Sequence, residues 1–192
     1  MKKAIILLLI WVVFCLCMAF IEVPFQLSET LCFGRDAFGR NLFLLIPKAA
    51  GLSILFALAA VLMATAVSIF FGSVIVFFPP LIKFTFLRVL DFFLAFPTIL
   101  IALTLAAMIG PGYHTLIVAL LIGVVPPYIR LVFLRSQEIQ AEDYVHASLG
   151  LGASPFEIIR HHLLPGLLAT CSVKVPHYFA YALIAEATLS FL

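Results

Sequence analysis

The sequence predicts an all-α polytopic membrane protein: one domain, residues 1–192, forming a helical bundle of about five transmembrane helices. Composition is the first observation, because 65% of the residues are hydrophobic and only 10% are charged. A soluble domain of this size could not cover so much apolar surface with so few charges, so lipid is the predicted solvent. The second observation is a series of uncharged stretches long enough to cross a bilayer, separated by polar segments.

The first uncharged stretch covers residues 4–21 and follows two lysines. It is long for a signal peptide and no small-x-small cleavage site follows it, so it predicts an uncleaved N-terminal anchor span. Residues 22–47 are mixed and polar and predict a loop, and the predicted core spans residues 42–192. Residues 49–78 form a long or tilted second span, whose many small side chains favour close packing against other helices.

Residues 92–129 are uncharged but too long for a single span. The sequence Gly110-Pro111-Gly112 breaks them, which predicts helices near 92–109 and 115–134. Three prolines inside these helices predict kinks: Pro97, Pro126 and Pro127. The last span is expected to begin at Leu163 or Pro165 and to run to the end of the sequence.

Residues 138–165 are the longest polar segment between the spans, and they predict two short helices joined by a glycine turn. The first helix covers 137–149, with one face at i, i+3, i+4 and i+7: Ala141, Tyr144, Val145 and Ser148. Gly150 and Gly152 permit the turn. The second helix begins with a capping box: Ser154, Pro155 and Glu157. A solvated connector and a docking element are both compatible with this pattern.

The basic residues predict the orientation of the chain in the membrane. With the N-terminus in the cytoplasm, the inner connectors hold Lys2, Lys3, Lys83, Arg88, Arg130, Arg135 and Arg160. The outer connectors hold Arg35, Arg40 and Lys48. This asymmetry of seven to three places residues 138–165 in the cytoplasm.

Five short motifs occur in this sequence in the same order as in a known protein family. Ala147-Ser148, Gly152 and Leu164-Pro165 resemble the cytoplasmic-loop signature of permease subunits in binding-protein-dependent ABC importers, which reads Glu-Ala-Ala, three residues, Gly, nine residues, Ile-x-Leu-Pro. The others resemble the dipeptide, oligopeptide and nickel class of that family: 34–41, 88–91 with 95–97, 143–145 and 185–192.

The resemblance implies that residues 138–165 form a coupling loop, which docks in a groove of a separate ATP-hydrolysing subunit. The residues that it assigns to docking and coupling are Tyr144, His146, Ala147, Ser148, Gly152, Ser154, Glu157, His162, Leu164 and Pro165. It also implies a bacterial inner-membrane permease that imports dipeptides, oligopeptides or nickel chelates by alternating access. The implied partners are a second permease subunit, cytoplasmic ATP-binding subunits, an extracytoplasmic solute-binding protein and the lipid bilayer.

The sequence also departs from the family pattern at several positions. His146 stands in place of Glu and His162 in place of Ile, and Arg35 replaces the usual Thr. Lys174 and Tyr178 stand where the class tends to have Gln and Gly. The sequence ends at Leu192, where the family continues into another span, so a truncated, non-transporting remnant is an alternative expectation.

Two charged residues in the last span are candidates for a pore or for the bundle interior. Glu186 is costly in hydrocarbon and should face the interior, a pore or a partner, unless it reaches water at the outer rim. Lys174 could instead extend to the cytoplasmic interface, which is the favoured interpretation. Near the start of the third span, Asp91 is expected to form a local ion pair with Arg88.

No motif in the sequence indicates an enzyme, a metal site or a cofactor. The chain has no Gly-x-x-x-x-Gly-Lys-Ser/Thr, so it should not hydrolyse ATP itself, and it has no His-Glu-x-x-His. No cofactor, metal or nucleic-acid partner is predicted. The alternative from another class is an intramembrane enzyme that uses Lys174, His177 and Glu186, but this alternative leaves the coupling loop and the ordered motifs unexplained.

Overall fold

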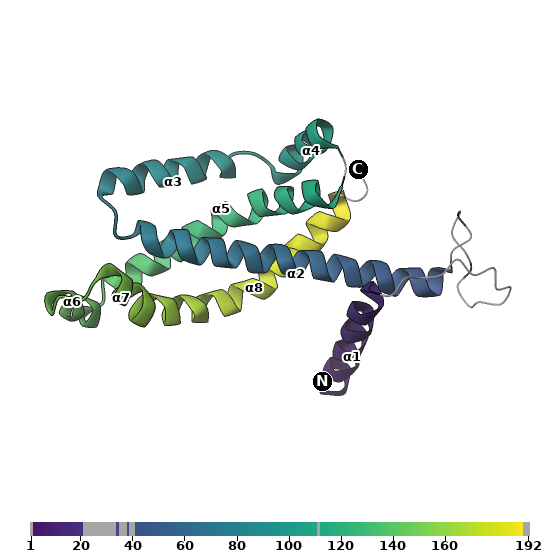
Figure 1. The fold of residues 1–192 in the computed structure, drawn as a ribbon, viewed down its shortest axis with the longest axis horizontal. Coiled ribbons are helices and arrows are strands. Elements are labelled where there is room, and N and C mark those ends of the chain that lie inside the picture. The colour runs from purple at the N-terminus through teal and green to yellow at the C-terminus, as the bar shows by residue number, and fades with distance from the viewer. Residues whose placement is uncertain (1, 21–33, 35–37, 39–40, 111, 190–192) are drawn as a thin grey trace. The chain divides into compact units, whose positions relative to one another are not determined.

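Helices make up most of the described chain, as Figure 1 shows. The computed structural model describes residues 2–20, 34, 38, 41–110 and 112–189. The elements are α1 (Lys2–Ala19), α2 (Leu42–Ile75), α3 (Pro80–Leu94), α4 (Thr98–Ile109), α5 (Tyr113–Gln140), α6 (Asp143–Gly150), α7 (Pro155–Ile158), the π-helical turn η1 (Ile159–Leu163) and α8 (Leu164–Leu189). The predicted all-α class is confirmed. Cys32, Arg35, most of the predicted loop 22–47 and residues 190–192 of the last motif lie outside the described residues.

Among the described residues, three helical stretches are long and apolar enough to cross a membrane: α2, residues 114–140 and residues 155–188. The pair α3 and α4 could form a fourth span, bent by 78° at the break between them. The apolar stretch Ile10–Ala19 of α1 is shorter, so the anchor span at residues 4–21 stays a prediction. The described part of the chain is therefore polytopic, with three or four candidate spans in addition to the predicted anchor span.

The chain divides into two units, residues 1–58 and 59–192, and α2 contributes to both. In the first unit, α1 packs against the beginning of α2 at Gly51. A Cβ atom at this position would overlap the carbonyl oxygen of Cys15, which is fully buried. A glycine is needed here because the two helix backbones approach so closely, as the small residues of this stretch predict.

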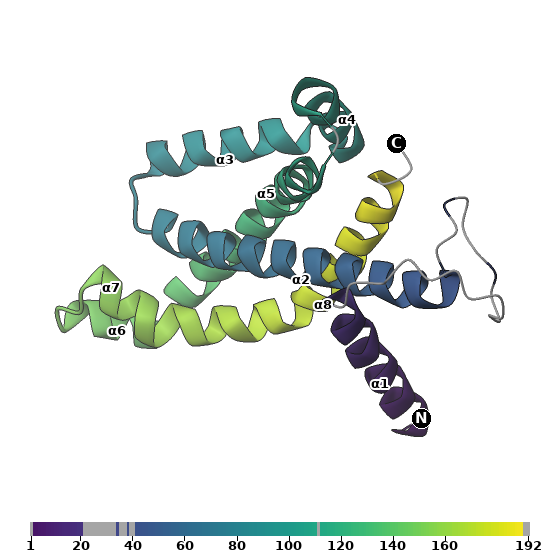
Figure 2. The same ribbon diagram turned by 45° about the vertical axis from the view of Figure 1, so that its right-hand side comes forward.

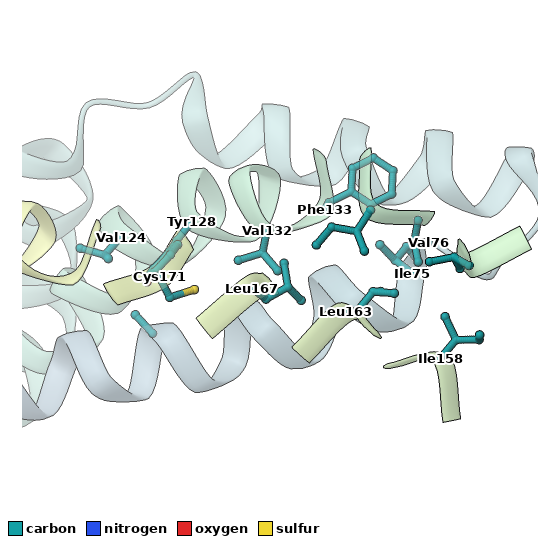
Figure 3. Close-up of a cluster of buried hydrophobic side chains, with 13 residues drawn as sticks. Ile75, Val76, Val124, Tyr128, Val132, Phe133, Ile158, Leu163, Leu167 and Cys171 are labelled. Carbon is teal, nitrogen blue, oxygen red and sulfur yellow. The ribbon is translucent and has the colours of Figure 1, made fainter. Parts of the chain in front are cut away.

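In the second unit, α5 is the central helix and contacts α3, α4 and α8. Its buried residues Val124, Tyr128 and Val132 are four positions apart and therefore lie on one face. Figure 3 shows these side chains beside Leu163, Leu167 and Cys171, which precede or belong to α8. Ala64 and Ile75 of α2, together with Val76 just after it, complete this side of the cluster. In lipid, such close packing and its dispersion contacts hold helices together.

Two of the predicted helix boundaries in this unit are wrong. Pro97 was expected to kink a helix covering 92–109, but α3 ends at Leu94 and α4 begins only at Thr98. Proline has no N–H to donate and disfavours a helical conformation in the residue before it, so the chain turns here rather than bending. Residues 80–91 were expected in a connector, but they form most of α3, which starts with Pro80 in the first turn.

The break between α4 and α5 is confirmed, because Gly110 ends α4 with a φ of 94°. Beyond it, α5 is longer than predicted and runs to Gln140 rather than to 134. The helix continues through Pro126 and Pro127, both of which lie inside its bounds. The packing of α5 against α4 and α8 thus outweighs the tendency of Pro126 and Pro127 to interrupt a helix.

Gly72 on α2 is a second close contact, and it supports a prediction about stability. A Cβ atom at Gly72 would lie 2.6 Å from Cγ1 and 2.8 Å from Cβ of Val132 on α5. Because these atoms are near the α5 backbone, the Gly72→Ala variant should push the helices apart and lose about 1–3 kcal/mol of stability. Thermal unfolding in detergent should show a lower midpoint.

The matched control for this prediction is Gly150→Ala, because Gly150 lies in α6 with open space around its Cα. Alanine is the better helix former there, so the midpoint should stay the same or rise slightly. Equal midpoints for Gly72→Ala and the unchanged protein would contradict the close contact between α2 and α5.

Candidate docking and coupling site

The predicted coupling loop folds as two short helices, α6 and α7, followed by the turn η1. Figures 1 and 2 show α6 and α7 together at one end of the second unit, away from α4. The first helix differs from its predicted bounds of 137–149, because residues 137–140 belong to α5 and Glu142 is extended, with φ −73° and ψ 142°. Ala141 therefore lies outside α6, and of the four residues of the predicted face only Val145 is buried.

The turn after α6 has a specific hydrogen-bond pattern. The Gly152 N–H donates to the Leu149 carbonyl at 3.0 Å, and the Ala153 N–H donates to the Ser148 carbonyl at 3.1 Å. These two bonds form a Schellman motif, in which the residue after the helix is left-handed. Gly152 takes this position with a φ of 92°, whereas Gly150 is the last residue of the helix. Of the two predicted turn glycines, only Gly152 is therefore needed for its conformation.

The capping box predicted at the start of the second helix is confirmed. The Glu157 N–H donates to the Ser154 hydroxyl at 3.3 Å, while the Ser154 N–H donates to the Glu157 carboxylate at 2.7 Å. Pro155 occupies the first turn, where its missing N–H costs nothing. The start of α7 is thus set by local sequence.

The capping box lies at the polar end of a helical stretch that is too long for the lipid. The stretch 155–188 has 34 residues, about 50 Å at 1.5 Å per residue, which exceeds a hydrocarbon layer of about 30 Å. We infer that its charged and polar beginning, with Glu157 and Arg160, extends beyond the layer, since charged side chains are costly in hydrocarbon. Hydrogen bonds from the Ser154 backbone and hydroxyl lower the pKa of the Glu157 carboxyl. This contribution to helix stability is present above the usual carboxyl pKa and is lost as the pH falls through the lowered one.

His162 joins η1 to α6 by polar and ring contacts. Its Nε2 lies 3.3 Å from the Ser148 hydroxyl, and its ring centroid lies 5.4 Å from that of Tyr144. The Ser148 hydroxyl also donates to the Tyr144 carbonyl at 2.9 Å. These contacts hold η1 against α6, and neither the spacing nor the sequence pattern indicated them.

The helix pair is attached to the bundle by apolar side chains. Val145, Ile158 and Leu163 are fully buried in the core cluster. Two large apolar side chains face away from it, because Leu151 is 90% exposed and Phe156 is 69% exposed. The predicted set of docking residues missed both, although an apolar residue in a short polar segment is a signal for an interface.

A cavity of about 430 Å³ lies between the end of α6 and the segment formed by α7 and η1. It is lined by Ser148, Leu151, Gly152, Ala153, Glu157, Ile158, His161 and His162. The predicted residues Ser148, Gly152, Glu157 and His162 are thus brought together, and Tyr144 contacts His162. His146 and Ala147 are exposed on α6 and do not line this cavity, and Leu164 and Pro165 form the first turn of α8.

Three predicted residues of the membrane region occupy different surroundings. Asp91 was expected to pair with Arg88, and that ion pair is present at 4.0 Å, but a closer partner is Arg130 of α5 at 2.5 Å. Asp91 therefore also links α3 to α5, which the sequence did not indicate. Glu186 is buried in the bundle, whereas Lys174 on the same helix is exposed. The intramembrane-enzyme alternative needs Lys174, His177 and Glu186 at one site. Lys174 and His177 are exposed, whereas Glu186 is buried, so the three side chains do not form one site. In the described ranges, no group of three or more His, Cys, Asp or Glu could hold a metal ion.

Comparison with known proteins identifies the family of this chain. Residues 64–192 match the family described as binding-protein-dependent transport system inner membrane component. The chain belongs to this family, and with its apolar helices it is a membrane protein.

Three relatives in the peptide class illustrate the match, which covers 83% of this chain in each case. A putative peptide transport system permease protein of Brucella suis is 35% identical. The dipeptide transport system permease protein DppC of Alkalihalophilus pseudofirmus is 33% identical, and the glutathione transport system permease protein GsiD of Escherichia coli is 28% identical. The chain spans about half the length of these relatives, between 53% and 54%.

Proposed function

We propose that the chain acts as a membrane-spanning permease subunit of an ATP-driven peptide importer. The observation that carries this proposal is the α6–α7 pair, fixed to the bundle by buried side chains and exposing Leu151 and Phe156 at its tip. Exposed apolar groups of this size on a polar element are characteristic of a binding surface. The names of the relatives, which specify peptide, dipeptide and glutathione transport, support a peptide as the solute.

In this proposal, α6, α7 and η1 form the docking site for a cytoplasmic ATP-binding subunit. A rigid connection is needed for coupling, and three features provide it: the Schellman turn at Gly152, the capping box of α7 and the contact of His162 with Ser148. The remaining proposed partners are a second permease subunit and an extracytoplasmic solute-binding protein. The test is co-purification of the chain with an ATP-binding subunit from membranes, together with ATP hydrolysis that peptide and binding protein stimulate. Loss of both would refute the proposal.

The proposed location is the bacterial inner membrane, with the N-terminus in the cytoplasm. The seven-to-three distribution of basic residues supports this orientation. A reporter fused after Arg160 should therefore be active only in the cytoplasm, and Cys32 should react with an impermeant thiol reagent added outside the cell. The opposite result in both assays would invert the topology and remove the docking site from the side where ATP is present.

A further inference from the structure

One side of α8 carries a line of polar residues that the docking site does not explain. From residue 170 onward, positions spaced by four and three residues are Thr170, Lys174, His177, Tyr181, Ile184 and Thr188. At 3.6 residues per turn, this spacing keeps all six within a sector of about 80°. Five of the six are polar, and we call this set the polar stripe.

The polar stripe lies beside the face of α8 that packs into the bundle, not on it. Leu167, Cys171 and Ala182 are buried, and Figure 3 shows the first two among the core side chains. In contrast, Lys174 and His177 are exposed, and so is Tyr181. The bundle core of this chain therefore does not shield the two ionisable side chains.

The depth of these residues makes contact with lipid unfavourable. Lys174 is ten residues from the start of α8 and His177 is thirteen, which corresponds to about 15 and 20 Å along the helix axis. Both positions fall near the middle of a hydrocarbon layer of about 30 Å. A lysine alone could extend toward the interface, but His177 is nearly one turn deeper and has a short side chain. In the assembled protein this side of α8 should therefore face water or a polar partner.

Toward the outer end, the polar stripe borders an open space. A cavity of about 200 Å³ lies between α4 and α8 and is lined by Thr98, Ile99, Tyr181, Ile184, Ala185 and Thr188. The Tyr181 hydroxyl donates to the Thr98 hydroxyl at 3.3 Å, so α4 adds a polar group at this point. A helix packed tightly along the whole stripe would not leave this space, which favours a solute path.

The charge of the polar stripe indicates which part of a solute it would contact. Lys174 contributes a positive charge, His177 lies one turn away, and none of the six stripe positions is acidic. We propose that the polar stripe lines the solute path and that Lys174, assisted by His177, contacts the C-terminal carboxylate of the peptide. This proposal rests on the proposed function, since a free peptide carries such a carboxylate.

The test uses single thiols in the chain assembled with its partner subunits, with the native cysteines replaced. The His177→Cys thiol should react at least tenfold faster with an anionic, membrane-impermeant methanethiosulfonate than the Ser172→Cys thiol does. Ser172 is a matched control because it is exposed and lies only two residues from Lys174, but about 160° around the helix. Equal rates would show that the polar stripe is no more hydrated than the rest of α8, which would overturn the proposal.

Lys174 variants then test the charge. Adding Lys174→Met to His177→Cys should slow the anionic reagent at least fivefold relative to a cationic one, whereas adding Lys174→Arg should leave the ratio unchanged. An unchanged ratio in Lys174→Met would overturn the assignment of Lys174.

Uptake of labelled dialanine is measured in parallel and should fall at least fivefold in Lys174→Met but not in Lys174→Arg. Full uptake in Lys174→Met would overturn the carboxylate contact. Absence of peptide uptake in the unaltered assembly would refute the proposed function. The reaction rates of the His177→Cys thiol would still decide whether the polar stripe faces an aqueous path that favours anions.

Discussion

The Gly152→Leu variant is expected to lose solute-stimulated ATP hydrolysis by about tenfold or more while still inserting into the membrane. Gly152 has a φ of 92°, a conformation that costs a side-chain-bearing residue about 1–3 kcal/mol. Since 1.4 kcal/mol corresponds to a factor of ten, the population of the native turn relative to other conformations should fall by about 5- to 150-fold. The space around Gly152 is open, so the strain lies in the backbone and can be relieved only by turning α7 away from α6.

The control for this variant is Gly152→Asn, which also places a side chain at residue 152. Asparagine adopts the left-handed conformation far more readily than leucine, so the turn should be retained. ATP hydrolysis and its stimulation by solute should therefore remain near the level of the unaltered protein. Equal losses in the two variants would mean that any side chain at this position, not the loss of the left-handed turn, causes the defect, and the coupling role of Gly152 would be wrong.

The Leu151→Asp variant is expected to lose the ATP-binding subunit during purification. Leu151 is 90% exposed in this chain, and burying a leucine at an interface stabilises binding by about 1.5–3 kcal/mol. The aspartate removes that contribution and adds the cost of desolvating a charge, so affinity should fall by about 100-fold or more. The ratio of co-purified ATP-binding subunit to permease measures this effect.

Ala141→Asp is the matched control, because it adds the same charge to an exposed position in the link between α5 and α6. Its only expected effect is a small loss at the helix end, about 0.3–1 kcal/mol. Undiminished co-purification of the Leu151→Asp variant would exclude Leu151 from the docking surface. Equal loss in both variants would indicate general electrostatic repulsion instead of a specific contact.

The features of this protein that the sequence alone determined are those whose causes are local. The apolar composition required helices in lipid, Gly110 stopped one helix, and Ser154 with Glu157 started another. Gly150 and Gly152 marked the turn because glycine adopts a positive φ readily, although only the structure shows that Gly152 is the residue that does so. In each case, the interacting groups are only a few residues apart in the chain, so their separation in the sequence largely fixes their positions in the structure.

Only the tertiary structure decided the contacts between distant residues. Asp91 pairs with Arg130, which is 39 residues away, and His162 meets Ser148 across the glycine turn. Gly72 needs to be glycine because Val132 of α5 lies against it, and α5 continues through two prolines because neighbouring helices support it. Residue pattern gives the face of a helix but not the partner that covers it. Partner choice depends on how all the helices pack together in lipid.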